Sequence, residues 1–143
     1  PMSEIIRDIT EIARCGAQYK ADTLNPLGLK GCHASYLTEI CSCPGISQDR
    51  LAQRICINKS NVARQAVILE EDGFILRKPS PADKRVMELY PTEKTLELLP
   101  KITAITSCWE HCLTDDMTQE EVQVITGILK RMKDKAAAWM DGR

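Results

Sequence analysis

The sequence predicts a mainly α-helical fold that carries one small β-hairpin, with its elements in the order ααααββαα. Two observations favour this fold class. Apolar residues recur at the three- and four-residue spacing of amphipathic helices along most of the chain. Two strand-like segments, Phe74–Lys78 and Arg85–Tyr90, flank a polar stretch that contains two prolines, which is typical of a hairpin. The length of 143 residues suits one domain that spans 1–143.

Two helices are predicted at the start of the chain. The first covers about 3–22 and places Ile5, Ile9 and Ile12 on one face. A loop follows because prolines and glycines interrupt the segment before about residue 32. The second helix is expected from about Cys32 to Ser42, before a Pro-Gly pair ends it.

A pair of short helices comes next. Ser47 is a good N-cap for the segment that follows it, and Asn58 is a second N-cap only a few residues later. Gly73 is expected to stop the second helix in the left-handed conformation. Two short helices joined by Cys56-Ile57 form a helix-turn-helix, and the hairpin directly behind them makes it a winged helix-turn-helix with a core at about 32–90.

Two further helices are predicted after the hairpin. Thr92 is the expected N-cap of the first, in which Pro100 should produce a kink. Thr118 and Glu121 form a capping box for the second. The segments at about 3–22 and 92–140 carry apolar stripes that one small domain cannot bury, so they are predicted to form the dimerisation region of a homodimer.

The charge distribution favours a nucleic-acid partner for the middle of the chain only. The chain has a net charge of −1, yet residues 45–87 carry eight Lys or Arg and five Asp or Glu, a local balance of +3. With 43% hydrophobic residues and no apolar run of about 20 residues, a globular protein without a membrane partner is expected. The N-terminal segment lacks the pattern of a secretory signal, and seven cysteines suit a reducing compartment, so we predict a cytoplasmic location.

Polar and basic side chains gather at the N-terminal part of the second helix of the pair. Arginine can bond guanine through two N–H groups, asparagine or glutamine can bond adenine at two atoms, and serine or lysine can hold phosphates. An ordinary solvated helix face would explain single residues but not the whole set between a helix and a charged hairpin. Double-stranded DNA is therefore the predicted partner of Lys59, Ser60, Asn61, Arg64 and Gln65.

The hairpin tip adds a second predicted contact with DNA. A cation at such a tip can enter the narrow minor groove of A/T-rich DNA, and Asp83 could fix the Arg85 side chain through a salt bridge. A generic hydrophilic turn is the alternative. We predict that Asp83, Lys84 and Arg85, together with Arg77 on the first strand, lie at the DNA interface.

The run LAQRICINKSNVARQ, the later LEEDGFI and the Asp-x-Arg arrangement of Asp83 and Arg85 resemble the winged-helix core of the MarR (multiple antibiotic resistance regulator) family. The resemblance extends over nearly the whole chain. It implies a bacterial transcriptional regulator that forms a triangular, intertwined helical dimer, with each wing beside its own recognition helix. The family's frequent Leu-Thr-x-x-Gly after the wing is replaced here, with Pro91 and Thr95 at the Leu and Gly positions.

Members of the family bind ligands, oxidants or metals where the dimer helices meet the winged domain, so the resemblance also implies an effector site. Thiolates beside an imidazole suit zinc or copper(I), and CWEHC places two thiols one helical turn apart. Three interpretations fit: buried packing thiols, thiol redox sensing, and a metal site. No cofactor is assigned beyond a possible metal or organic effector. The candidate sensor residues are Cys15, Cys32, His33, Tyr36, Cys108, His111 and Cys112. Cys41, Cys43 and Cys56 are predicted to be packing residues.

Motifs of common enzyme classes are absent from the sequence, which has no Gly-x-Ser-x-Gly, His-Glu-x-x-His, P-loop or dinucleotide fingerprint. We therefore predict no enzymatic activity. The predicted function is a sequence-specific transcriptional regulator, a repressor that a small molecule, oxidant or metal releases. The alternative is a winged-helix module that binds protein instead of DNA.

Overall fold

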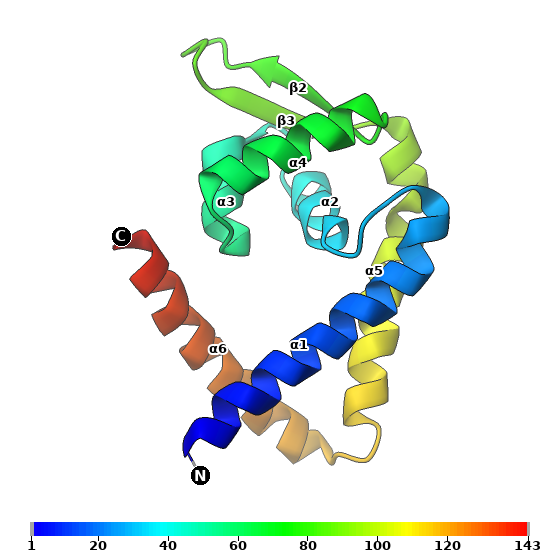
Figure 1. Ribbon diagram of the computed structural model, residues 1–143, viewed down its shortest axis with the longest axis vertical. Coiled ribbons are helices and arrows are strands. Elements are labelled where there is room, and N and C mark those ends of the chain that lie inside the picture. The colour runs from blue at the N-terminus through cyan, green and yellow to red at the C-terminus, as the bar shows by residue number, and fades with distance from the viewer. Residues whose placement is uncertain (1, 143) are drawn as a thin grey trace.

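The computed structural model describes residues 2–142, of which residues 2 and 3 by their backbone only. Its helices and strands follow the predicted order, with one short strand added before the helix pair (Figure 1). The elements are α1 (Met2–Leu24), a 3₁₀ turn (Asn25–Leu27), α2 (His33–Ser42), β1 (Ile46–Ser47), α3 (Gln48–Ile55), α4 (Lys59–Glu71), β2 (Ile75–Pro79), β3 (Met87–Pro91), α5 (Glu93–Thr114) and α6 (Gln119–Asp141). The predicted fold class is confirmed.

The helix-turn-helix is formed by α3 and α4, and local hydrogen bonds determine where each helix begins. The Ser47 hydroxyl accepts a hydrogen bond from the Arg50 amide at 3.0 Å, and the Asn58 side chain accepts one from the Asn61 amide at 2.8 Å. Cys56 ends α3 in the left-handed conformation with φ of 57°, so the chain reverses within three residues. Gly73, with φ of 82°, follows the end of α4 as predicted.

The hairpin belongs to a three-stranded antiparallel sheet in the order β1-β3-β2. Strands β2 and β3 lie one or two residues later than predicted, and Leu76 pairs with Tyr90 in their register. Strand β1 was missed because two residues are too few to show an alternating pattern. It pairs Ile46 with Leu89 and joins the start of α3 to the wing.

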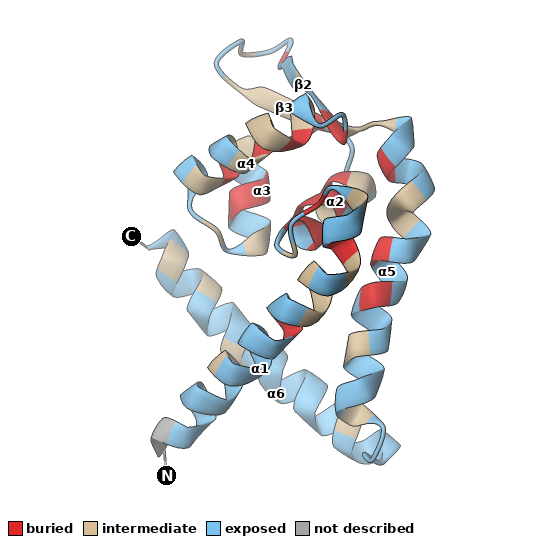
Figure 2. Cartoon of the chain, turned by 45° about the vertical axis from the view of Figure 1, so that its right-hand side comes forward, coloured by how far each residue is buried: buried red, intermediate tan, exposed pale blue. Residues whose placement is uncertain are grey.

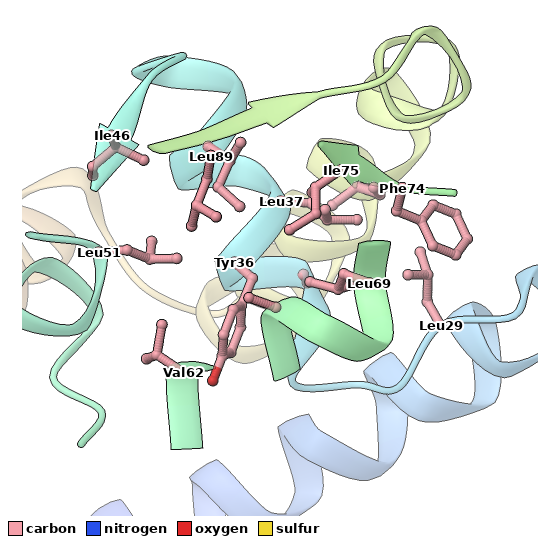
Figure 3. Close-up of a cluster of buried hydrophobic side chains, with 14 of the residues drawn as sticks. Leu29, Tyr36, Leu37, Ile46, Leu51, Val62, Leu69, Phe74, Ile75 and Leu89 are labelled. Atoms are coloured by element: carbon pink, nitrogen blue, oxygen red, sulfur yellow. The ribbon is translucent and has the colours of Figure 1, made fainter. Parts of the chain in front are cut away.

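One hydrophobic core lies at the centre of the winged domain, and α2 runs through it (Figures 2 and 3). Tyr36 and Leu37 of α2 meet Val62 and Leu69 of α4, and all four are almost completely buried. Phe74 joins the same cluster from the segment that leads into β2. The inward face of α4 is therefore fixed by packing, which leaves its opposite face to solvent.

Helices α1, α5 and α6 extend away from this core, and much of their apolar surface is exposed (Figure 2). Helix α1 crosses α5 at Gly16, where a Cβ atom would lie 2.8 Å from Nε1 of Trp109. The rings of Tyr19 and Trp109 pack beside this crossing with centroids 5.0 Å apart. Pro100 lies inside α5, and the capping box of Thr118 and Glu121 is present at the start of α6.

The start of α5 is bonded to the end of α4. The Thr92 hydroxyl donates to the Gly73 carbonyl at 2.7 Å, and the Thr95 hydroxyl donates to the Phe74 carbonyl at 2.6 Å. Lys94 Nζ donates to the Asp72 carbonyl at 3.0 Å. Thr92 thus occupies the N-cap position as predicted, but its hydroxyl makes no capping bond. Instead, it helps α5 hold three consecutive carbonyls that follow α4.

Candidate nucleic-acid interface

Helix α4 has a well-ordered N-terminal end that faces solvent. Oδ1 of Asn58 accepts from the Asn61 amide at 2.8 Å and from Oγ of Ser60 at 2.9 Å. Ser60 and Lys59 are exposed beside this cap. The unbonded amides of a first helical turn carry a partial positive charge, so this end of α4 suits a phosphate group.

The outward face of α4 carries basic side chains in loose contacts. Lys59 Nζ lies 3.6 Å from Oδ2 of Asp49, and the two side chains are 70% and 69% exposed. Arg64 is exposed, and its Nη2 lies 3.4 Å from Oδ1 of Asn61. Exposed pairs of this kind contribute little free energy, so a phosphate or a guanine edge can replace them.

Gln65 lies on the flank of α4, one residue before buried Ala66, and its side chain turns toward α2. Its Oε1 lies 2.8 Å from Nε2 of buried His33. Gln65 is half-buried at the edge of the outward face that carries Ser60 and Arg64, and only its amide oxygen is directed toward α2. A contact of Gln65 with DNA stays a prediction.

The wing tip is ordered by the predicted salt bridge. Asp83 Oδ1 accepts from the Arg85 amide at 3.0 Å and from Arg85 Nε at 3.2 Å, while Oδ2 accepts from Nη2 at 3.2 Å. These bonds hold the pKa of the Asp83 carboxyl below its usual value. The Arg85 side chain is 92% exposed, so its guanidinium is oriented yet accessible. Lys84 beside it is exposed as well.

Arg77 connects the wing to α4. Its Nε donates to Oε1 of Glu70 at 3.1 Å, and its backbone amide donates to Oε2 of the same carboxylate at 3.1 Å. The Arg77 side chain is half-buried. This pair fixes β2 against α4, and a DNA contact from Arg77 stays a prediction.

The seven cysteines, all in the described part of the chain, are not core residues. Six are exposed and Cys41 is partly exposed. The interpretation of these thiols as buried packing residues is therefore wrong within one chain, including for Cys43 and Cys56. The reason is local: Cys43 and Cys56 sit at helix ends, where the chain turns at the surface.

The candidate sensor residues do not form one cluster. Cys15 of α1 lines a groove with Trp109 of α5, whereas His33 and Tyr36 are buried in the winged domain. Cys108, His111 and Cys112 are exposed on α5. Among the residues that the structure describes, no group of three or more His, Cys, Asp or Glu side chains could hold a metal ion. A metal site in one chain therefore has no support from this arrangement.

Two sets of contacts at this interface were missed from the sequence. One is the bond between His33 and Gln65, and the other is the bonding of Thr92, Lys94 and Thr95 to the carbonyls that follow α4. The bond between His33 and Gln65 had one signal in the sequence, namely the position of Gln65 on its helix three residues after inward-facing Val62. The second had no signal beyond the threonines themselves.

An exposed helix N-terminus behind a tight turn, flanked by a charged and ordered hairpin, defines a winged helix-turn-helix protein of the kind found in transcriptional regulators. The model of the MarR family matches residues 33–87. The chain is 30% identical to the HTH-type transcriptional regulator YybA of Bacillus subtilis (strain 168), itself uncharacterised, over 92% of this chain and 88% of that protein. The chain belongs to the MarR family of transcriptional regulators.

Solved structures agree with this assignment. A MarR protein from Peptoclostridium difficile superimposes with a TM-score of 0.94 at 26% identity, covering 96% of this chain and 90% of that one. A protein described as a MarR family transcriptional regulator from Listeria monocytogenes, complexed with 26mer DNA, gives a TM-score of 0.90 at 29% identity, covering 94% and 90%. These relatives are regulators and not enzymes, which confirms the prediction made from the missing motifs. Within residues 2–142 no helix is long and apolar enough to span a bilayer.

Proposed function

We propose that this protein binds double-stranded DNA sequence-specifically as a homodimer and represses transcription until a signal releases it. In this proposal α4 enters the major groove and the wing enters the adjacent minor groove. The observation that carries it is the pairing of two exposed cationic elements on one domain, Arg64 on the outward face of α4 and Arg85 held by Asp83 at the wing tip. The relative from Listeria monocytogenes that was crystallised with DNA supports the same function.

The proposed dimer rests on exposed apolar residues of the terminal helices. Ile5 and Ile6 of α1 are more than half exposed, and Ile125, Ile128 and Leu129 of α6 are exposed as well. A largely apolar groove between these helices is lined by Ile6, Ile9, Leu129 and Met132, among others. Apolar surface of this extent marks an interaction site, and a two-fold axis would bury the same faces of both subunits.

Repression and release are proposed from the path of α5. Helix α5 begins at the wing, where Thr95 is bonded to Phe74, and extends to the exposed region that holds Cys108 and Cys112. A signal bound to the dimer helices would change the separation of the two α4 helices, and with it the affinity for DNA. A dimer that covers two successive major grooves excludes RNA polymerase from an overlapping promoter by its volume alone.

The DNA-binding proposal is tested by selecting duplexes from a random pool and measuring affinity for the selected site. Arg64→Ala should weaken binding to that site by about 1–3 kcal/mol and relax its sequence preference, because a guanine contact is lost. Arg14→Ala on α1 is the matched control, and it should bind as the wild type does. If the wild type selects no DNA sequence but binds another protein, the alternative function, a winged-helix module that binds protein instead of DNA, is favoured.

The release proposal is tested on the same site with zinc, copper(I) or a hydroperoxide added to the reduced protein. A sensing role predicts loss of DNA binding in the wild type and retention in Cys108→Ser and Cys112→Ser, since exposed thiols are accessible to these reagents. Unchanged affinity of the wild type with all three would assign the signal to an organic ligand instead.

A further inference from the structure

A buried histidine determines how the side chain of Gln65 is presented. His33 is the first residue of α2 and only 2% exposed. Its Nδ1 accepts a hydrogen bond from the backbone amide of Lys30 at 3.1 Å. An imidazole nitrogen that accepts is unprotonated, so the proton of the neutral ring is on Nε2. Burial lowers the pKa of His33, which keeps the ring in this neutral form.

The protonated Nε2 of His33 faces the amide oxygen of Gln65. The distance between Nε2 and Oε1 is 2.8 Å, so the ring donates and the amide oxygen accepts. The Gln65 side chain is only partly buried, and its amide makes no second hydrogen bond within residues 2–142. The Gln65 amide nitrogen, which carries two N–H donors, is therefore the end of the group that can still be presented to a partner.

This arrangement excludes one way of contacting a base. A glutamine that bonds adenine at two atoms must turn both its oxygen and its nitrogen toward N6 and N7 of that base. Turning Oε1 of Gln65 outward would break its bond with His33 and leave a buried N–H without an acceptor, which is unfavourable. Acceptors such as N7 or O6 of guanine, O4 of thymine or a phosphate oxygen need only the N–H donors.

We infer that His33 is a specificity-determining residue that acts through Gln65: by occupying the amide oxygen, it makes Gln65 a donor only, so that Gln65 contacts a hydrogen-bond acceptor on DNA and not adenine at two atoms. The inference rests on the proposed function, because it requires α4 to bind DNA. His33 touches no base itself. It positions the side chain of a recognition-helix residue from inside the winged domain.

A double-mutant cycle on DNA affinity tests this inference. The wild type, His33→Phe, Gln65→Ala and the double variant are measured on the selected site and on duplexes with each base pair substituted in turn. Freeing Oε1 in His33→Phe should raise the relative affinity for adenine at one position by about fivefold or more. In the Gln65→Ala background the same His33 substitution should have no effect, because it acts only through Gln65.

Two further variants separate this role from a general change in the core. His33→Gln keeps an N–H donor at a similar reach and should retain the wild-type base preference. Tyr36→Phe removes a buried hydroxyl that has no hydrogen-bond partner in the described part of the chain, and it should retain the preference too. A shift toward adenine in Tyr36→Phe equal to that in His33→Phe would overturn the inference.

Two outcomes distinguish whether the hydrogen-bond acceptor that Gln65 contacts is a base or a phosphate. If it is a base, Gln65→Ala relaxes the preference at one position. If it is a phosphate, Gln65→Ala lowers affinity equally on all sequences, and a methylphosphonate at one position removes this difference between the wild type and Gln65→Ala. The inference is wrong if Gln65→Ala binds every duplex as the wild type does, or if the effect of His33→Phe persists without Gln65. A wild type that selects no sequence would instead refute the proposed function.

Discussion

Replacing Thr95 with valine removes one hydroxyl from the joint between the recognition helix and α5 while keeping the shape of the side chain. Thr95 is fully buried, and its hydroxyl donates to the Phe74 carbonyl at 2.6 Å. A typical hydrogen bond contributes about 0.5–1.5 kcal/mol net, and an acceptor left unpaired in the interior costs about 1–3 kcal/mol. The Phe74 carbonyl also accepts from the Thr92 amide at 3.2 Å, so it would keep one partner. We therefore expect Thr95→Val to lower the free energy of unfolding by about 1–2 kcal/mol.

Thr92→Val provides the matched control for this prediction. The Thr92 hydroxyl makes a bond of similar length, 2.7 Å to the Gly73 carbonyl, but this bond is exposed and Thr92 itself is only half-buried. Water can replace it there, so the expected loss is below about 0.5 kcal/mol. Both variants are unfolded with urea and by heating at one fixed protein concentration, because the stability of a dimer depends on concentration. The expected difference in Tm is about 4 °C per kcal/mol. If Thr95→Val and Thr92→Val lose the same free energy of unfolding, the claim that burial makes the Thr95 bond more important is refuted.

Three other predictions follow from contacts described above. Arg85→Ala should weaken DNA binding most on sites whose minor groove is narrowed by A/T pairs, and an equal loss on G/C-substituted sites would contradict a minor-groove role. Burial lowers the pKa of His33, so below its ordinary value of 6.5 the unfolded chain takes up a proton that the folded chain resists. The free energy of unfolding should accordingly fall as the pH drops through 6.5, and His33→Gln should flatten this slope. Gly16→Val should displace Trp109, which lies 2.8 Å from the added Cβ, and destabilise the protein by about 1–3 kcal/mol with a change in tryptophan fluorescence. Gly127→Val, where the Cβ meets nothing within 4 Å, should leave that fluorescence unchanged.

Features that depend on neighbouring residues could be predicted from the sequence. The caps at Ser47, Asn58 and Thr118 were identified because each bonds an amide three residues later. The bridge between Asp83 and Arg85 was predicted for the same reason, since the two residues are separated by one position. The order of the helices and the position of the wing followed from these local signals and from helical periodicity.

Features that depend on distant partners could not be predicted. Gln65 is bonded to a residue 32 positions away, so no local pattern shows that its amide oxygen is directed toward α2. Strand β1 exists only because Ile46 pairs with Leu89 from the far strand of the hairpin. The exposure of the cysteines was missed for a related reason: a small apolar residue type favours the interior on average, but Cys56 is placed at a left-handed turn by the chain reversal itself.

The central claim is that two copies of α4, held by a dimer, contact DNA on successive turns of one face. Hydroxyl-radical footprinting of the wild type on its selected site tests this most directly. The account predicts two regions of protection with centres about 10 base pairs apart, with further protection beside each where the wing meets the minor groove. The protection assigned to the wing should disappear in Arg85→Ala while the two central regions remain. A single protected region, or two regions on opposite faces of the duplex, would contradict the account.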